Sequence, residues 1–263
     1  MKSQLETTIQ KYKDLGIDRQ LDYEKFYLYS LITHSTAIEG STITELENQI
    51  MFDNGLAIKG KTIIEQNMNL DLKAAYERMQ TFAKERTPLT VDILRQLSAL
   101  TMKNTGTLYH TALGDFSSAD GDLRLLNVSA GIGGKSYMSY NKVPSKLNEF
   151  CNWLNNEREN TVKMTVDEIY NLSFDAHYKL VTIHPWADGN GRMARLLMNW
   201  IQFENNLITS KILTEDKEEY IKALVETRES ENLNVFRDFM TRSMVRNLNT
   251  EIKQFEDSTL ADV

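Results

Sequence analysis

Long amphipathic segments, interrupted by only three prolines at positions 88, 144 and 185, dominate this chain of 263 residues. Within each segment apolar residues recur every three to four positions, the spacing that lines one face of an α-helix. These segments cover residues 23–38, 63–83, 91–103, 143–156, 165–183, 191–206, 216–228 and 234–255. The pattern predicts a mainly α fold. Because composition does not break along the chain, we expect a single domain over residues 1–263.

One segment departs from helical periodicity. Residues 114–141 are rich in glycine, and the sequence "AGIGGK" at 130–135 is flanked by the short β-type runs "LRLLNV" at 123–128 and "SYMSY" at 136–140. Short runs of this kind around a glycine-rich turn are typical of a β-hairpin. We therefore expect a loop that leads into a hairpin here.

Charge and composition narrow the class of partner. The net charge is −7 and the isoelectric point is near 5.3, so the chain lacks the basic footprint of a nucleic-acid-binding or membrane-surface protein. Its one cysteine, Cys151, allows no intrachain disulfide. The first residues carry no apolar signal core, and no apolar run reaches the roughly 18 residues of a membrane span. These features predict a cytoplasmic protein with no nucleic-acid or membrane partner.

The stretch "HPWADGNGRMAR", residues 184–195, concentrates groups that suit anion chemistry. His184 precedes Pro185, and a residue before proline avoids helical geometry, so the preceding helix should end there. A new helical pattern begins near Gly191. The N–H groups of Gly189, Asn190 and Gly191 would then lie at a helix N-terminus, which attracts anions. The two glycines leave the backbone bare for a close approach.

The charged side chains of the same stretch complete this arrangement. Arg192 and Arg195 are three residues apart, so they share a helix face and can grip phosphate oxygens. Asp188 can hold Mg²⁺, which takes one or two carboxylates together with substrate phosphates. His184 is a base with a suitable pKa. The stretch therefore predicts a site for a metal-bound phosphate ester.

This stretch resembles the signature of the Fic (Fido) family, His-Pro-Phe-x-Asp/Glu-Gly-Asn-Gly-Arg-x-x-Arg. It differs only at Trp186, where the family usually has phenylalanine as a hydrophobic anchor. The resemblance extends from about Ile38 to the C-terminal helix. It implies a Fic-type helical domain with a β-hairpin flap. Most Fic enzymes transfer AMP from ATP to a hydroxyl group of a protein serine, threonine or tyrosine.

The resemblance also implies a role for each residue of the signature. His184 would be the base that takes the hydroxyl proton, and Asp188 would hold Mg²⁺, or Mn²⁺ in its place, between the α- and β-phosphates. The implied phosphate-binding residues are the anion-hole residues Gly189, Asn190 and Gly191, Arg192 at the β-phosphate and Arg195 at the γ-phosphate.

The family's flap would correspond to about residues 127–140. Its backbone would align the target segment by strand addition. Nucleotide contacts implied for the flap fall at Ile132, Gly133, Gly134 and Lys135. Tyr220 and Thr227, on a later helix, fall about where the family lines its base pocket.

The sequence "STAIEG", residues 35–40, matches the family's inhibitory motif, [Ser/Thr]-x-x-x-Glu-[Gly/Asn], through Ser35, Glu39 and Gly40. Its place before the signature resembles the class with an N-terminal inhibitory helix, here about residues 22–40. Pairing of Glu39 with Arg195 would withhold Arg195 from the γ-phosphate and misalign the α-phosphate. In related enzymes such a glutamate also supports removal of AMP by positioning water.

A different nucleotide site is suggested by "GLAIKGKT", residues 55–62, which fits the P-loop pattern at every fixed position. That pattern requires a buried strand before the loop and a helix after it. The preceding segment "TITELENQIMFDN" is amphipathic and acidic, so a turn between two helices is favoured, with Gly55 ending the first and Gly60 preceding the second. "SAGIGGKS", residues 129–136, lacks the first glycine of the pattern and is better explained as a hairpin turn.

The leading hypothesis is a self-inhibited protein adenylyltransferase that uses Mg²⁺ and ATP. Three alternatives stay open: a Fic-type transferase with another nucleotide donor, a P-loop NTPase that uses Lys61 and Thr62, and a non-catalytic nucleotide sensor. The expected partners are ATP and a target protein that the sequence does not identify. A homo-oligomer is compatible with the sequence.

Overall fold

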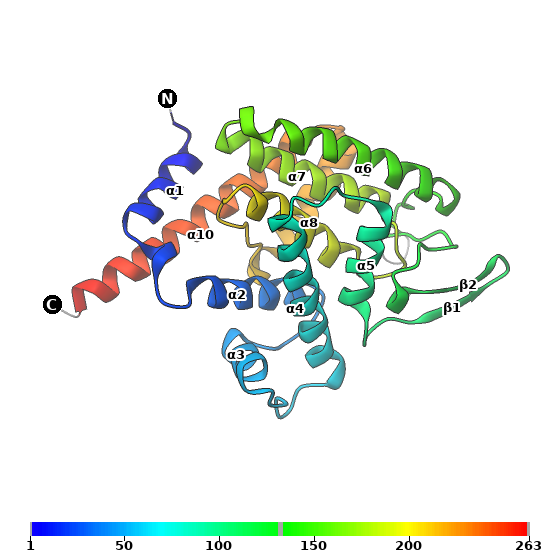
Figure 1. The fold of residues 1–263 in the computed structure, drawn as a ribbon, viewed down its shortest axis with the longest axis horizontal. Coiled ribbons are helices and arrows are strands. Elements are labelled where there is room, and N and C mark those ends of the chain that lie inside the picture. The colour runs from blue at the N-terminus through cyan, green and yellow to red at the C-terminus, as the bar shows by residue number, and fades with distance from the viewer. Residues whose placement is uncertain (1, 131–133, 262–263) are drawn as a thin grey trace.

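The computed structural model describes residues 2–130 and 134–261, and it is mainly helical, as the sequence predicts (Figure 1). Two of the sequence-predicted nucleotide contacts, Ile132 and Gly133, lie outside the described residues. The helices are α1 (Gln4–Asp14), α2 (Tyr23–Ile38), α3 (Glu45–Asn54), α4 (Ile63–Lys84), α5 (Val91–Met102), α6 (Val143–Asn160), α7 (Val166–Ile183), α8 (Asn190–Glu204), α9 (Lys217–Ser230) and α10 (Leu233–Ala261). The strands are β1 (Leu108–Thr111) and β2 (Gly114–Ser117).

Side-chain caps start the two helices that lead to the site. At α7 the Thr165 hydroxyl accepts the Glu168 N–H at 3.3 Å, while the Glu168 carboxylate accepts the Thr165 N–H at 2.7 Å. This reciprocal capping box satisfies N–H groups that have no partner inside the helix. At α5 the Thr90 hydroxyl accepts the Ile93 N–H at 3.2 Å.

The centre of the molecule is α8, which packs against α7 on one side and α4 on the other. Every residue from Arg192 to Gln202 is buried, including Trp200, which stacks on Phe82 of α4 with ring centroids 5.8 Å apart. A helix enclosed this completely cannot shift without breaking the packing around it. The N-terminus of α8, where the 184–195 stretch lies, is therefore a fixed point of the fold.

A second apolar cluster joins the two ends of the chain. Leu5, Ile9 and Tyr12 of α1 are buried in it with Phe236 and Phe239 of α10. In Figure 1 the blue α1 lies across the red end of α10. The sequence analysis did not predict α1 as a helix, although its apolar residues follow helical spacing.

The predicted hairpin differs from the observed structure. The runs at 123–128 and 136–140 were expected as strands and are not; a single antiparallel bridge, Ser129 with Ser136, joins them. The regular strands are instead β1 and β2, which pair from Leu108–Ser117 to Thr111–Gly114. The Leu126 and Met138 carbonyls accept from the Arg124 guanidinium and not from N–H groups of the opposite run, so the two runs pair over a shorter length than the sequence pattern suggests.

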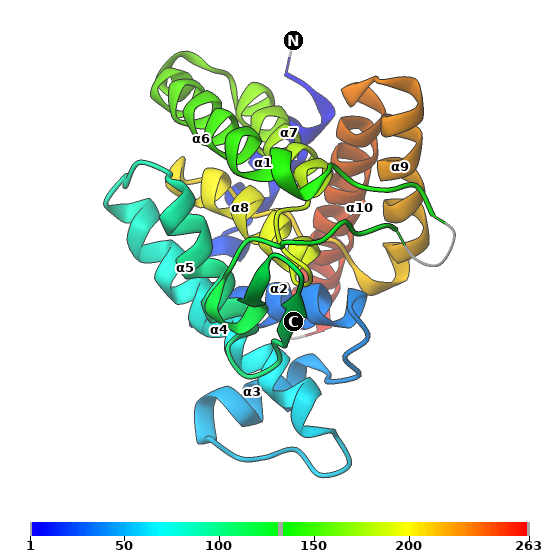
Figure 2. The same cartoon turned by 90° about the vertical axis from the view of Figure 1, so that its right-hand side faces the viewer.

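We call the two extended segments at residues 126–130 and 134–140 the flap limbs. They are held together by the Tyr137 N–H, which donates to the Val128 carbonyl at 3.0 Å, and by the Ala130 N–H, which donates to the Lys135 carbonyl at 3.3 Å. Figure 2 shows that the chain between β2 and α6 crosses the face of the molecule from the side of α5 to the side of α9.

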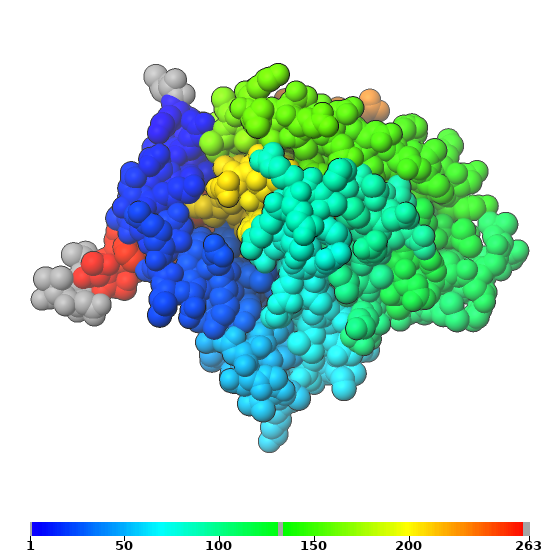
Figure 3. Space-filling view, in the orientation of Figure 1, coloured from blue at the N-terminus to red at the C-terminus, as the bar shows by residue number. Residues whose placement is uncertain are grey.

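On another face, a hollow of about 630 Å³ lies between α2, α4 and the C-terminal end of α8. Figure 3 shows it as a recess between the blue α2 region and the cyan to teal α4 and α5 region, with yellow residues of the α8 end inside. Among the helices of the described residues, none combines the length and the apolarity that crossing a membrane requires.

Candidate active site at the N-terminus of helix α8

His184 ends α7 in a left-handed conformation, with φ 52° and its N–H bonded to the Leu180 carbonyl at 3.0 Å. Its Nδ1 lies 3.2 Å from the Val181 carbonyl oxygen. A carbonyl only accepts, so Nδ1 carries the proton and Nε2 keeps a free lone pair. The sequence-predicted base is therefore held as the tautomer that accepts a proton at Nε2.

The surroundings keep the His184 imidazole neutral. Burial, together with the Arg124 guanidinium, lowers its pKa to about 4, against the Val181 carbonyl, Asp188 and Glu39, which raise it. A neutral imidazole at pH 7 is the form that a general base requires.

The loop after His184 is braced by side chains that point back into it. The Asn190 amide accepts the Trp186 N–H at 3.1 Å and donates to the Trp186 carbonyl at 2.9 Å. The Trp186 indole is fully buried and donates to the Gly121 carbonyl at 3.2 Å. The Asn190 side chain is thus used to shape the loop, and its backbone N–H is the group left for an anion.

Both glycines of the loop lie close to side chains of other helices. Gly189 has φ +81°, and a Cβ there would lie 2.8 Å from the Met102 sulfur. A Cβ on Gly191 would lie 2.6 Å from the Glu39 carboxylate. The first N–H bonded inside α8 is that of Met193, to Gly189, so helix geometry leaves the earlier N–H groups pointing toward the loop.

Arg192 is buried yet poorly partnered. Its Nη1 lies 3.4 Å from the Thr101 carbonyl, its Nη2 lies 2.9 Å from the Met102 sulfur, and within the described residues its buried Nε has no hydrogen-bond partner. Burial lowers its pKa. Buried polar groups are normally satisfied, so a guanidinium with weak partners indicates a place for an anionic ligand.

Asp188 lies beside this arginine with its side chain 60% exposed. One carboxylate oxygen accepts the Gly189 N–H at 2.6 Å. Over residues 2–130 and 134–261, no three His, Cys, Asp or Glu side chains cluster closely enough to hold a metal. A single accessible carboxylate next to an anion-binding helix end fits Mg²⁺, whose remaining ligands would be phosphate oxygens and water.

Glu39 and Arg195 form an ion pair, with the Glu39 Oε1 2.6 Å from the Arg195 Nη2. Ser35 completes the contact, because its hydroxyl accepts from the Arg195 Nε at 2.8 Å and its carbonyl accepts from Nη2 at 2.9 Å. Burial alone would raise the pKa of Glu39, but Arg195 holds it below its usual value. Gly40 has φ +106°, which explains the glycine after the glutamate. All three residues of the "STAIEG" motif thus contribute to the geometry around Arg195.

Two flap-side residues contact His184 and were missed by the sequence analysis. The Tyr137 ring stacks on the His184 imidazole with centroids 3.7 Å apart and planes at 14°. Arg124 donates from Nε to the His184 carbonyl at 2.7 Å. Arg124 stands between two leucines in "DLRLL", and an arginine within an apolar run is a signal of a buried, partnered guanidinium that could have been noticed.

The sequence profile of the Fic/DOC family matches residues 88–202, which include the whole 184–195 stretch. This chain belongs to the Fic/DOC family. The architecture agrees over almost the full length. A Fic domain containing signaling protein from Bacteroides thetaiotaomicron superposes with a TM-score of 0.79 at 21% identity, covering 97% of this chain and 98% of that one. Fic-1 (residues 134–508) from Caenorhabditis elegans superposes with a TM-score of 0.73 at 24% identity, covering 99% of this chain and 73% of that one.

Sequence relatives carry a named activity. Protein adenylyltransferase fic-1 of Caenorhabditis elegans is 28% identical over 208 residues, 78% of this chain and 37% of that protein. Protein adenylyltransferase Fic of Drosophila grimshawi is 32% identical over 171 residues, 64% of this chain and 31% of that protein. This Fic-family chain therefore spans about a third of the length of these relatives.

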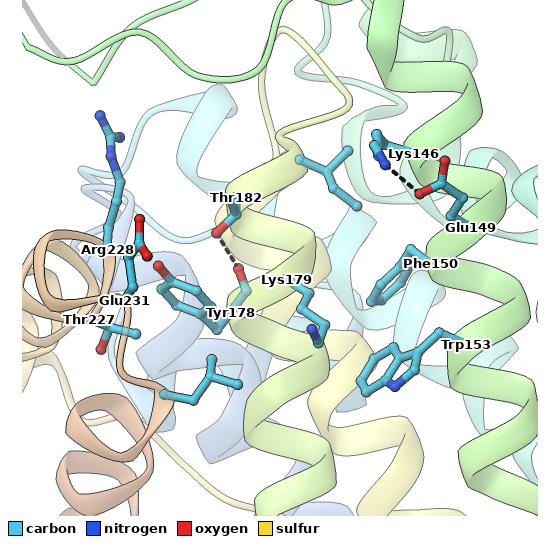
Figure 4. A pocket seen from close by; sticks show the side chains of 12 residues that line it. Lys146, Glu149, Phe150, Trp153, Tyr178, Lys179, Thr182, Thr227, Arg228 and Glu231 are labelled. Atoms are coloured by element: carbon cyan, nitrogen blue, oxygen red, sulfur yellow. Dashed lines mark hydrogen bonds and ion pairs between the residues drawn. The ribbon is translucent and has the colours of Figure 1, made fainter.

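The two residues expected in the base pocket lie in different surroundings. Tyr220 is buried, and its hydroxyl lies 3.0 Å from the Nε2 of the buried His177. Thr227 lines a cavity of about 500 Å³ between α6, α7 and α9, together with Tyr178 and Arg228 (Figure 4). Their assignment to a base pocket stays a prediction.

The second flap limb reaches α9 through Lys135. Lys135 pairs with Glu229, with Nζ 3.0 Å from the carboxylate oxygen. At Gly134 a Cβ would lie 1.7 Å from the Ala130 carbonyl oxygen, so only glycine fits where the limbs converge. Whether Gly134 and Lys135 contact a nucleotide stays a prediction.

The P-loop hypothesis is wrong, because helix α3, not a strand, precedes residues 55–62. Gly55 caps α3 with φ +66°, as the turn interpretation predicts. Lys61 donates to the Thr42 carbonyl at 2.6 Å, and Thr62 caps α4 in a capping box with Glu65. Both residues have structural partners.

Proposed function

We propose that this Fic-family chain is a protein adenylyltransferase that moves AMP from Mg²⁺-ATP to a serine, threonine or tyrosine hydroxyl of a target protein. The observation that carries the proposal is the arrangement at one helix end: a neutral His184 with Nε2 free, next to bare N–H groups and the buried, poorly partnered Arg192. The named activity of the relatives supports AMP as the transferred group.

The chemistry follows from the positions of these groups. His184 Nε2 takes the hydroxyl proton as the hydroxyl oxygen bonds to the α-phosphorus. The bond from that phosphorus to the β-phosphate oxygen breaks, and pyrophosphate leaves. The N–H groups of Asn190 and Gly191 and the guanidinium of Arg192 neutralise the growing negative charge. Asp188 would hold Mg²⁺ (or Mn²⁺), which would supply further positive charge to the phosphates.

We further propose that Glu39 restrains the reaction. In the structure it occupies the Arg195 guanidinium, which would otherwise be available for the γ-phosphate. The Gly191 backbone lies next to the same carboxylate, so Glu39 also narrows the space in front of residues 189–191, the proposed anion hole. The same carboxylate could position water for removal of AMP from a modified target.

The flap limbs are proposed to align the target. Extended backbone offers N–H and C=O groups to any extended segment, so it fixes the position of a hydroxyl with little demand on sequence. The second limb carries Tyr137 onto His184. A target segment along this limb would therefore pass next to the proposed base.

A transferase with another nucleotide donor is the second candidate. The loop and the two arginines Arg192 and Arg195 suit a triphosphate with any base. The nucleotide's base would be recognised at another place, and the cavity lined by Thr227 and Arg228 is a candidate for that pocket.

The proposed function is tested with purified wild type, Glu39→Gly and Glu39→Gly/His184→Ala chains, incubated with a host lysate and Mg²⁺. Each nucleotide, labelled at the α-phosphate, is added in turn, and modified peptides are identified by mass spectrometry. We expect AMP on serine, threonine or tyrosine with Glu39→Gly, and none with the double variant. Nucleotide binding by the chain without transfer in any variant would indicate a sensor instead. Transfer of a different nucleotide would select the second candidate.

A further inference from the structure

Arg124 is a buried arginine that has no acidic partner among the residues the structure describes. Its residue surface is only 1% exposed, and burial is the one cause that lowers its pKa. Arg158, a buried arginine far from the site, instead pairs with the Glu204 carboxylate at 2.5 Å. Because a buried charge is costly unless its hydrogen bonds are satisfied, the contacts of Arg124 must be specific.

Three backbone carbonyls satisfy this guanidinium. Nε donates to the His184 carbonyl at 2.7 Å, and Nη1 donates to the Leu126 carbonyl at 2.7 Å. Nη2 donates to the Met138 carbonyl. Leu126 begins the first flap limb and Met138 lies in the second. One side chain therefore binds both limbs of the flap and the residue proposed as the base.

Neighbouring contacts reinforce the same junction. The Arg124 N–H donates to the Pro185 carbonyl at 3.1 Å, and the Trp186 indole donates to the Gly121 carbonyl at 3.2 Å. The segment at residues 121–124, which precedes the flap limbs, is thus hydrogen-bonded to Pro185 and Trp186, the residues that follow His184. Met138 directly follows Tyr137, whose ring covers the His184 imidazole.

Only arginine has the shape for this role. Its planar fork presents five N–H donors in fixed directions, whereas a lysine ammonium is a compact point charge on a flexible stem. Three carbonyls from three separate segments need divergent donors. Charge-assisted hydrogen bonds of this kind are roughly twice as strong as neutral ones.

Arg124 also contributes to the electrostatics of His184. The groups that face the imidazole are Arg124, which lowers its pKa, and Asp188, Glu39 and the Val181 carbonyl, which raise it. Tyr137 covers the ring from the flap. Removal of the guanidinium would therefore favour protonation of His184, the form that cannot act as a base.

We propose that Arg124 is a positioning residue that locks both flap limbs and His184 into one rigid unit, so that a hydroxyl aligned by the flap meets Nε2. The expected effect on activity rests on the proposed transferase function. The locking of the flap limbs to His184 can be measured without any reaction.

The test compares the full chain with Arg124→Met, which removes the charge and the fork, and Arg124→Lys, which keeps only the charge. Arg95→Met is the matched control. Arg95 holds the same loop from α5, through the Gly121 carbonyl at 3.3 Å and Asp122 at 2.6 Å, without contacting the flap or His184. Circular dichroism melting confirms that each variant is folded.

Two NMR readouts are independent of activity. Hydrogen exchange is followed at the Ala130 and Tyr137 amides, which join the limbs, and the imidazole titration is followed with His184→Asn as the assignment reference. We expect faster exchange of both amides in Arg124→Met and Arg124→Lys. The His184 midpoint should rise above about 4 in Arg124→Met and rise less in Arg124→Lys, which keeps the cation. Arg95→Met should leave both readouts as in wild type.

The functional readout is self-labelling from α-labelled ATP in the Glu39→Gly background. Misplacement of reacting groups by about 1 Å costs roughly 100-fold in rate. We expect kcat to fall by about that factor in Arg124→Met while the KM for ATP stays unchanged, because the phosphate-binding residues are untouched. In Arg124→Met the remaining rate should begin to fall at a higher pH on the acid side of its pH profile.

Wild-type amide exchange and an unchanged His184 titration in Arg124→Met would overturn the proposal. So would equal changes in Arg95→Met, since they would trace the effect to general loosening of the loop. If the NMR changes occur but no variant of the Glu39→Gly chain transfers label, the locking is correct and the proposed function fails.

Discussion

At the scale of single residues, the site depends on where protons and charges are held. His184 is positioned by backbone: its Nδ1 proton is fixed by the Val181 carbonyl, and its own carbonyl is bound by Arg124. Asp188 is the opposite case, an accessible carboxylate that accepts the Gly189 N–H next to it and lies 3.9 Å from the Arg192 guanidinium. The proposed base is therefore held in place by hydrogen bonds, while the carboxylate proposed to bind the metal is exposed to solvent.

His184→Ala in the Glu39→Gly background should reduce self-labelling by roughly 10²–10⁴-fold, the usual contribution of a general base. With His184 present, the free base persists at pH values well below the ordinary 6.5, because burial lowers its pKa to about 4. The rate should thus stay nearly constant from about pH 7 to pH 6 and fall as the pH approaches 4. A rate that halves near pH 6.5 would contradict the buried, neutral imidazole.

Asp188→Ala should weaken the dependence of transfer on Mg²⁺ and on Mn²⁺, because it removes the carboxylate nearest the anion loop. Asp188→Asn is the size-matched variant that keeps an oxygen but loses the charge. Calorimetry of Mg²⁺-ATP binding and a metal titration of self-labelling measure the effect. Identical metal titrations in wild type and both variants would exclude Asp188 as the ligand.

At the scale of elements, the end of α2 meets α8 at the ion pair of Glu39 with Arg195. The pair is mostly shielded, with 4% exposure for the Arg195 side chain and 33% for Glu39. Ser35, one turn earlier on α2, binds the same guanidinium. Helix α2 therefore reaches the site through Ser35 and Glu39, one turn of helix apart.

Glu39→Gly should raise self-labelling, because it returns Arg195 to the nucleotide. A charge-assisted hydrogen bond is worth on the order of 1.5–3 kcal/mol, which corresponds to roughly 10- to 150-fold. Glu24→Gln is the control, because it removes the charge of an exposed glutamate in the first turn of the same helix. It should leave self-labelling unchanged. Glu39→Gly/Arg195→Ala should lose the gain.

Equal labelling of wild type and Glu39→Gly would remove the restraining role of Glu39. Strong labelling by the double variant would instead remove Arg195 as the group that Glu39 withholds.

At the scale of the whole molecule, neutral histidines inside the fold link its stability to pH. His177 is fully buried beside Tyr220, and burial lowers its pKa to about 3. In the unfolded chain the same group has a pKa near 6.5, so the unfolded state binds more protons below that value. The free energy of unfolding should therefore decrease as the pH falls from about 6.5 toward 3.

His177→Phe should remove this part of the acid sensitivity. A shift of this size corresponds to a few kcal/mol, on the order of 1.4 kcal/mol per pKa unit. Urea unfolding of wild type and His177→Phe at pH 7 and at pH 5 measures the difference. His110→Phe, at an exposed histidine in β1, is the control. Equal pH dependence of wild type and His177→Phe would show that folding does not lower the pKa of His177.

The sequence by itself determined most of the helical segments and the 184–195 stretch proposed to bind the nucleotide, because both are local. Helical spacing and capping residues such as Thr165 depend on neighbours within a few positions, and the agreement at α2 and α7 follows from that. The order of groups from His184 to Arg195 is likewise contiguous in sequence. The "STAIEG" motif is not adjacent to this stretch, but the resemblance to the Fic family supplied Arg195 as the expected partner of Glu39.

Only the tertiary structure decided what joins distant segments. Arg124 binds a carbonyl 60 residues away, and Tyr137 stacks on a ring 47 positions later, so no local spacing announces either contact. The expected strands at 123–128 and 136–140 depended on cross-strand pairing, which the fold replaces with contacts to Arg124 and to the end of α7. Asn190 was expected in the anion hole through its backbone N–H, and only the structure shows that its side chain binds the Trp186 backbone. These outcomes were decided by hydrogen bonds and packing between residues that are far apart in the sequence. The spacing of residues along the chain does not reveal such contacts.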